Sequence, residues 1–321
     1  MNINYGFENE KFYIDYVACS RPAGNMREES DRRAKELYEK YNGQLTLAFS
    51  SGIDSQAVLH SFVDQGLPIK TVFKHMPGFN DDELANIKIL DSKYGITTDI
   101  IDIDVMSIQK QLEEEELDTG IQIYSLLWKY FISLLPKDVN FVQMAHDPYV
   151  HFSTFNKKRR FFMSWNGPDI SKDRAYQLIK QDRTGDYIFY GDTPEFLHSI
   201  LNDDIYRAAM HSVEYFINNG LQKDNVDLDK LDRWDYYIKP LVYGKYWKGE
   251  LEYFSKFVGF KNIPYLIRPL EFFKEHPKMG FFTYSVTPIY EEFIEFLGQN
   301  NGQVKRFYQQ FAERNGKLVK I

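Results

Sequence analysis

A short run of small and hydroxyl-bearing residues, Ser50-Ser51-Gly52-Ile53-Asp54-Ser55, carries the chemistry that this sequence suggests most directly. The backbone N–H groups of such a loop can hold phosphate oxygens, above all where the loop opens a helix whose positive end faces the ligand. The carboxylate of Asp54 suits Mg²⁺, a hard cation that prefers oxygen ligands. The loop is not a Walker A motif, because no Gly-Lys-Ser/Thr follows it. A serine- and glycine-rich turn without a ligand is the simpler alternative.

The residues on either side place this loop between a strand and a helix. Residues 45–49 form a short apolar run that is typical of a buried strand. Ala57, Val58 and Phe62 then recur at helical spacing, and Gly66 is a stop signal for that helix. A strand-to-helix turn is a favourable place for phosphate, so the flanking pattern favours nucleotide binding over an empty turn.

Residues 50–55 resemble the PP-loop, Ser-Gly-Gly-x-Asp-Ser, of the ATP pyrophosphatases, which include asparagine synthetase, GMP synthetase and NAD synthetase. Members of this superfamily split ATP between its α and β phosphates to adenylate a substrate. The resemblance implies an α/β fold with a doubly wound parallel sheet, and ATP and Mg²⁺ as cofactors. Ser51 departs from the motif, since most members have glycine there, and a side chain would be strained if that residue had a positive φ.

The pattern of strands and helices agrees with such a sheet. Strand–helix alternation predicts a parallel sheet covered on both faces. We expect strands at residues 45–49, 69–75, 98–103 and 141–145, and helices at 54–65, 80–94, 105–116 and 119–135. A hairpin within residues 2–18 and a helix at 26–42 precede the core, and Thr193 and Pro194 signal the start of a later helix.

Ligands of doubly wound sheets lie beyond the carboxyl ends of the strands, and the resemblance assigns roles at two of these ends. It implies that the adenine lies at the end of the second strand. The expected nucleotide-binding residues are Ala48, Phe49, Ser50, Ser51, Gly52, Asp54, Ser55, Phe73, Lys74, His75 and Met76. Asp54 is the expected Mg²⁺ ligand. Asp147, just after the fourth strand, is either a second metal carboxylate or a loop-capping aspartate.

A second resemblance lies within residues 239–260. Relatives of the GMP synthetase and NAD synthetase type often have Pro-Leu, then Lys-x-Glu-Val, then a helix that ends in Leu-Gly. The corresponding positions here are Pro240-Leu241, Lys248-Gly249-Glu250-Leu251 and Val258-Gly259. The resemblance implies that a lysine at this helix start reaches the ATP phosphates, with Lys248 as the candidate and Lys245 as its rival. A surface lysine that opens an amphipathic helix is the alternative.

Composition limits the class of reaction. The formal charge of −7 argues against broad nucleic-acid binding, and no long apolar run suggests a membrane span. Cys19 is the single cysteine, so neither a cysteine pair nor an amidase nucleophile is apparent. The basic run Lys157-Lys158-Arg159-Arg160 is either a solvated hairpin tip or a substrate clamp.

The prediction is therefore a cytoplasmic, AMP-forming enzyme that adenylates a small carboxylate or amide for attack by ammonia or an amine. It would act on a small-molecule acceptor without nucleic acid or membrane, and a homo-oligomer is compatible with the sequence. A nucleotide-binding or structural protein without turnover, and a sulfur-transferring or tRNA-modifying relative, are the alternatives. We expect an N-terminal addition at 1–43, a core at 44–260 with an insertion near 150–235, and a helical extension at 261–321.

Overall fold

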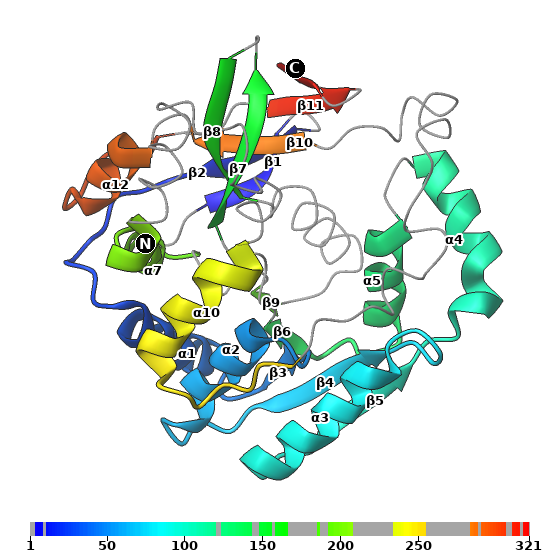
Figure 1. Ribbon diagram of the computed structural model, residues 1–321. Coiled ribbons are helices and arrows are strands. Elements are labelled where there is room, and N and C mark those ends of the chain that lie inside the picture. The colour runs from blue at the N-terminus through cyan, green and yellow to red at the C-terminus, as the bar shows by residue number, and fades with distance from the viewer. Residues whose placement is uncertain are drawn as a thin grey trace, which may run out of the picture.

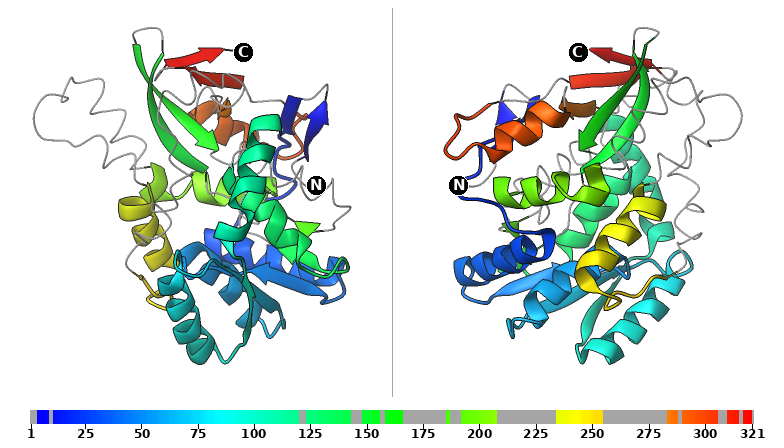
Figure 2. Two further views of the ribbon diagram at one scale, coloured as in Figure 1. Left: turned by 90° about the vertical axis from the view of Figure 1, so that its right-hand side faces the viewer. Right: turned by 60° about the vertical axis from the view of Figure 1, so that its left-hand side comes forward.

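The computed structural model shows a parallel sheet with helices on both faces, a five-stranded antiparallel sheet and a two-stranded N-terminal hairpin (Figure 1). It describes residues 4–8, 11–119, 123–142, 148–155, 158–165, 185–186, 192–207, 234–254, 283–287, 290–305, 310–314 and 317–320. In Figures 1 and 2, helices α7 (Pro194–Leu201) and α10 (Trp234–Trp247) lie between the parallel sheet and the five-stranded antiparallel sheet.

The N-terminal hairpin and helix form as the sequence predicts. Strand β1 (Asn4–Glu8) pairs antiparallel with β2 (Lys11–Asp15). Helix α1 (Met26–Lys40) begins at a capping box. The side chain of Asn25 accepts from the N–H of Glu28, and the Glu28 carboxylate accepts from the N–H of Asn25. A buried face of α1 packs on the core.

The parallel sheet confirms the predicted fold class. Its strands are β3 (Leu45–Ala48), β4 (Lys70–His75), β5 (Thr98–Asp102), β6 (Asn140–Val142) and β9 (Gly185–Asp186), in the order β5-β4-β3-β6-β9. Every neighbouring pair is parallel. The first four lie where the apolar runs predict them, whereas β9 falls in a stretch without a clear strand signal.

Helices cover both faces of this sheet, which makes it doubly wound. They are α2 (Ile53–Val63), α3 (Asp81–Tyr94), α4 (Val105–Thr119) and α5 (Ile123–Ser133). Side chains alternate along β4, so Phe73 joins a core with α1, α2 and α3, and Val72 joins another with α4 and α5. Helix α3 ends as predicted, because Gly95 adopts the left-handed conformation at φ 63°.

The helices that follow the parallel sheet agree with the sequence in part. Thr193 caps α7 and Pro194 is its first residue, as predicted. Helix α10 runs through Pro240 and ends at Trp247, and the described residues after it, up to Phe254, are not helical. The expectation that a helix starts at Lys248 is therefore wrong, because Pro240 lies inside a helix that precedes this lysine.

The antiparallel sheet gathers distant parts of the chain. Its strands are β7 (Pro148–Phe155), β8 (Lys158–Trp165), β10 (Thr283–Thr287), β11 (Gln310–Arg314) and β12 (Lys317–Lys320), in the order β12-β11-β10-β8-β7. The expected helical extension contributes α12 (Tyr290–Gly298) and three of these strands. Within the described ranges, no helix combines the length and the apolar character that crossing a membrane requires.

Candidate functional site

The serine-rich loop lies at the centre of the parallel sheet. It follows β3, and the next strand along the chain, β4, pairs with one side of β3 while β6 pairs with the other. The strand order thus reverses at β3, and the crevice outside the carboxyl ends at such a switch point is where open α/β sheets bind ligands. The buried ring of Phe49 anchors the start of the loop in the core, and its N–H donates to the carbonyl of Val72 at 2.9 Å.

Two serine hydroxyls meet inside the loop. The Oγ atoms of Ser50 and Ser55 lie 3.1 Å apart, and Ser55 also donates to the carbonyl of Gly52 at 2.9 Å. Gly52 is the exposed N-cap of α2 and supplies no side-chain cap to the first turn. Since the first N–H groups of a helix lack partners within the helix, this turn presents donors and a positive dipole end to an anion.

Ser51 fits the position where relatives carry glycine. Among the described residues, positive φ outside glycine occurs at Asn42, Lys248 and Asn301, so the strain considered for Ser51 does not arise. The residue is buried, its hydroxyl lies 3.4 Å from the Asn86 amide nitrogen, and its carbonyl accepts from the amide of Gln56 at 2.9 Å. These contacts hold the loop backbone from the side of α2 and α3.

Asp54 stands in the first turn of α2, where a carboxylate is favoured by the helix dipole. The hydroxyl of Tyr243 donates to its Oδ1 at 2.6 Å. Tyr243 is buried in helix α10 and packs beside the ring of Trp247. The sequence offers no sign of this bond, because its partners are separated by 189 positions and no local pattern joins them.

Gln56, which directly follows the loop at residues 50–55, also contacts the loop, although it is not part of the motif. Its side chain is fully buried and makes four hydrogen bonds. Its amide nitrogen donates to the carbonyls of Ser51 and Glu252, both at 2.9 Å. Its amide oxygen accepts from the N–H of Glu252 at 2.8 Å and from the hydroxyl of Tyr94 at 3.0 Å. Gln56 thereby ties the loop to the segment after α10.

The end of β4, where the adenine is expected, is closely packed. Phe73 and Met76 are buried in the two opposite cores. Lys74 extends over the Trp128 ring, with its Nζ 5.9 Å from the ring centroid. His75 lies between two carboxylates, with Nδ1 2.6 Å from Asp102 and Nε2 2.9 Å from Asp81. Of the four expected adenine residues, Lys74 is the one whose side chain is not buried.

The backbone at the same place already has partners within the chain. The side chain of Asn80 accepts from the N–H of Met76 at 2.6 Å and donates to the carbonyl of Lys74 at 2.9 Å. The carbonyl of His75 accepts from Ile103 at 2.8 Å. An adenine bound by these backbone groups would have to share or exchange these bonds.

The two candidate lysines differ in their surroundings. Lys245 forms ion pairs with Asp203, at 2.8 Å, and with Asp204. Although burial lowers the pKa of Lys245, its hydrogen bonds with these carboxylates raise the pKa well above the ordinary value. Lys245 follows Tyr243 by two residues, about 200° around the helix, so it faces away from the side of α10 that meets Asp54. Lys248 is exposed and directly follows α10, with φ 44°.

The remaining site predictions are placed only in part. Ala48 ends β3 immediately before the loop. Asp147 lies outside the described residues, and so does Lys157 of the basic run, whose next three residues begin β8. The structure thus brings Ser50, Asp54 and Ser55 together at the start of α2, with Tyr243 from α10, and leaves Lys245 on a different face.

No protein-family model matches this sequence, and no curated protein matches it. Among solved structures, the chain is similar to the NH3-dependent NAD synthetase from Campylobacter jejuni subsp. jejuni NCTC 11168, in complex with the nitrate ion. The match covers 73% of this chain and 100% of that chain, with 13% sequence identity and a TM-score of 0.31. A likeness at this level carries no conclusion about activity.

Proposed function

We propose that this chain is an ATP-dependent, AMP-forming enzyme that adenylates a small carboxylate or amide for attack by ammonia or an amine. The observation that supports this most is the loop at residues 50–55. It stands at the switch point of a doubly wound sheet, opens α2, brings two serine hydroxyls together and places Asp54 in the first turn of that helix. The motif lies between a strand and a helix, as a phosphate-binding loop requires. The motif and its position together support the proposal better than the motif alone.

The residues of the loop would hold the phosphates of ATP. The N–H groups at the start of α2 and the hydroxyls of Ser50, Ser51 and Ser55 would bind the β and γ phosphate oxygens. Asp54 and these hydroxyls form an oxygen-only set of donors, which fits Mg²⁺, and the ion would offset phosphate charge when bound. Lys248 would add a positive charge near the leaving pyrophosphate.

The proposed reaction needs little covalent chemistry from the protein. An oxygen of the acceptor attacks the α phosphorus, the bond to the bridging oxygen of the β phosphate breaks, and pyrophosphate leaves. Ammonia or an amine then attacks the activated carbon, and AMP leaves with the former acceptor oxygen. The chain contributes by positioning ATP and the acceptor and by stabilising negative charge.

Cys19 supports a nitrogen or oxygen nucleophile over sulfur chemistry. It is the single cysteine of the chain and is 2% exposed. Burial, with smaller contributions from Glu195 and Glu29, raises the pKa of its thiol to about 12. The thiol would thus remain protonated near neutral pH, and a protonated thiol is a poor nucleophile.

Nucleotide binding without turnover is a second candidate, because the chain itself occupies parts of the site. Tyr243 donates to Asp54, the proposed Mg²⁺ ligand, at 2.6 Å. Asn80 bonds the backbone at the end of β4, where adenine is expected. A protein that retains the pocket as a sensor or scaffold would tolerate both contacts.

Exchange of labelled pyrophosphate into ATP, screened over candidate carboxylates and amides, separates the two functions. Under the proposed function one acceptor supports exchange, and Asp54→Ala abolishes it while leaving the fold intact. Lys248→Ala should slow exchange more than Lys245→Ala. A nucleotide-dependent rise in melting temperature with no exchange for any acceptor would favour binding without turnover. ATP converted to ADP and orthophosphate would contradict the proposal.

A further inference from the structure

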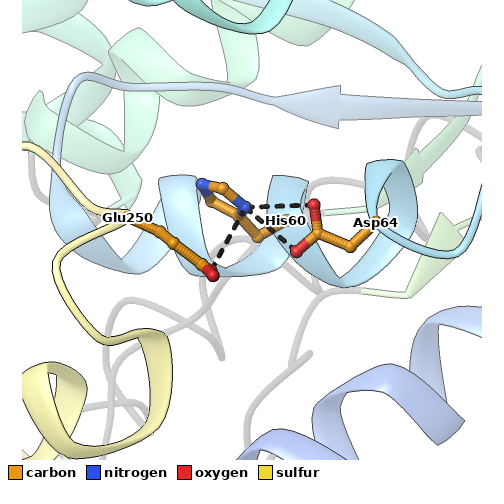
Figure 3. Close-up of side chains that lie close together, drawn as sticks. All are labelled: His60, Asp64 and Glu250. Atoms are coloured by element: carbon orange, nitrogen blue, oxygen red, sulfur yellow. Dashed lines mark hydrogen bonds and ion pairs between the residues drawn. The ribbon is translucent and has the colours of Figure 1, made fainter.

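Three side chains outside the proposed ATP site converge between α2 and the segment that follows α10. His60 in the last turn of α2 and Asp64, the C-cap residue of this helix, are four positions apart and therefore lie on one face. Glu250 reaches them from the segment after α10 (Figure 3). His60 Nδ1 is 3.1 Å from Asp64 Oδ2 and 3.8 Å from Glu250 Oε2. One ligand atom from each residue lies within 4.8 Å of the others.

The donor atoms and their spacing suit a divalent transition metal. Zn²⁺ is bound by imidazole nitrogen and carboxylate oxygen at about 2.0–2.2 Å, so neighbouring donors in a tetrahedral site lie about 3.3 Å apart. Of the two distances from His60 Nδ1, the one to Asp64, 3.1 Å, is close to this value, and the one to Glu250, 3.8 Å, is about 0.5 Å longer. Three protein ligands of this kind leave a fourth position for water.

The burial of His60 indicates that its imidazole is aimed at this cluster. The residue is 8% exposed and packs edge-to-face against the Tyr94 ring, with centroids 4.9 Å apart. Its Nε2 is buried and makes no hydrogen bond to any described residue. The polar contacts of this buried ring are therefore the two carboxylates at Nδ1.

The local charge favours a cation. Arg27 bonds Asp31 through Nε at 2.9 Å, Asp64 through Nη2 at 2.6 Å and Glu250 through Nη1 at 3.4 Å. Three carboxylates against one guanidinium leave two negative charges, which a divalent ion would balance. A carboxylate can accept from an arginine and also bind a metal, because it offers about four lone-pair sites. Arg27 would then orient the ligands from outside the metal's own coordination shell.

We propose that His60, Asp64 and Glu250 bind one divalent transition-metal ion of the zinc class, which fastens the segment after α10 to α2. The ligands come from chain positions about 190 residues apart, so the ion would close a long loop. The site is separate from residues 50–55 and does not depend on ATP binding there.

Binding of Zn²⁺ and Co²⁺ to the full chain, after removal of metals with a chelator, tests this proposal in the absence of nucleotide. Calorimetry gives stoichiometry and affinity, and the visible spectrum of Co²⁺ reports its coordination. We expect one ion per chain and a higher melting temperature with Zn²⁺. Loss of an outer-shell partner already costs about 10- to 100-fold in affinity. Glu250→Gln and His60→Gln should therefore each weaken binding by at least about 10-fold.

Two control variants locate the ion. Glu252→Gln removes a neighbouring carboxylate that pairs with Lys93 at 2.6 Å, and Asp54→Asn removes the proposed Mg²⁺ ligand. Both should bind Zn²⁺ as the unmodified chain does. Glu250 is half exposed, so Glu250→Gln tests the site even if His60→Gln fails to fold. Absence of saturable binding to the unmodified chain, or equal binding by Glu250→Gln, would overturn the proposal, and so would loss of binding in Asp54→Asn.

Discussion

Replacing Gln56 with leucine removes the side chain that joins the serine-rich loop to the segment after α10. The substitution keeps a similar volume but leaves the carbonyl of Ser51, both backbone groups of Glu252 and the hydroxyl of Tyr94 without this partner. The position is fully buried, so solvent cannot replace the lost bonds at Gln56 itself.

The expected loss of stability follows from these four bonds. The hydroxyl of Tyr94 also lies 3.4 Å from the carbonyl of Glu250, so it can turn to that acceptor. Three backbone groups then remain without a hydrogen-bond partner, and each unsatisfied buried group costs about 1–3 kcal/mol. Because Glu252 is partly exposed, we take the low end and expect Gln56→Leu to lower the unfolding free energy by about 3–4 kcal/mol.

Urea unfolding followed by circular dichroism measures this change, with Gln109→Leu as the matched control. Gln109 makes one bond, to Glu113 at 3.1 Å, on the partly exposed surface of α4, and should lose less than about 1 kcal/mol. Gln56→Glu should lose at least as much as Gln56→Leu, because its buried carboxylate would face the carbonyl oxygens of Ser51 and Glu252. Equal losses for Gln56→Leu and Gln109→Leu would refute the structural role given to Gln56.

Three further predictions concern stability and reactivity. Tyr243→Phe should lower the unfolding free energy by about 1 kcal/mol in urea titrations, because Asp54 loses one hydrogen bond. Lys245→Met should cost about 1–2 kcal/mol by the same measurement, since Asp203 is buried and Lys245 is itself partly exposed and screened. The thiol of Cys19, with its pKa raised by burial from 9.0 to about 12, should resist alkylation at pH 8.5 until the chain is unfolded.

The raised pKa of Cys19 also makes the unfolding free energy depend on pH. The folded state holds the thiol proton more tightly than the unfolded state, so its contribution is fully present below about pH 9 and is lost as pH rises toward 12. Cys19 should contribute up to about 1.4 kcal/mol per pH unit to the fall of the unfolding free energy in this window, and Cys19→Ala should reduce the slope by that amount. Rapid alkylation of the native chain, or an unchanged slope in Cys19→Ala, would contradict the burial of this thiol.

The parts of the fold that the sequence predicts are those with strong local signals. The apolar run at 45–49 predicts the first core strand to within one residue, and the predicted helix at 80–94 matches α3, which runs from Asp81 to Tyr94. The loop at 50–55 stood out because small hydroxyl residues between a strand and a helix are chemically distinctive. Burial and hydrogen bonding in these elements depend mostly on near neighbours in the chain, so a short window of sequence carries the information.

The contacts that define the site depend on residues far apart in sequence. Tyr243 meets Asp54, and Gln56 meets Glu252, only after α10 has packed on α2. Gln56 carried no clear signal, because His60 and Asp64, four and eight positions further along, are also polar residues on that face of α2. The resemblance at residues 239–260 misled the prediction, because it placed a helix start at Lys248, whereas α10 runs through Pro240 and ends just before this lysine.

The order of strands in the antiparallel sheet has a consequence for synthesis on the ribosome. Strand β8 is complete at residue 165, but β10, which pairs with its open side, begins at residue 283. In a nascent chain, one edge of β8 therefore stays unpaired while more than a hundred further residues are translated. Unpaired edges of this kind pair readily with other chains, so truncated products that end before β10 should aggregate more readily than the full chain.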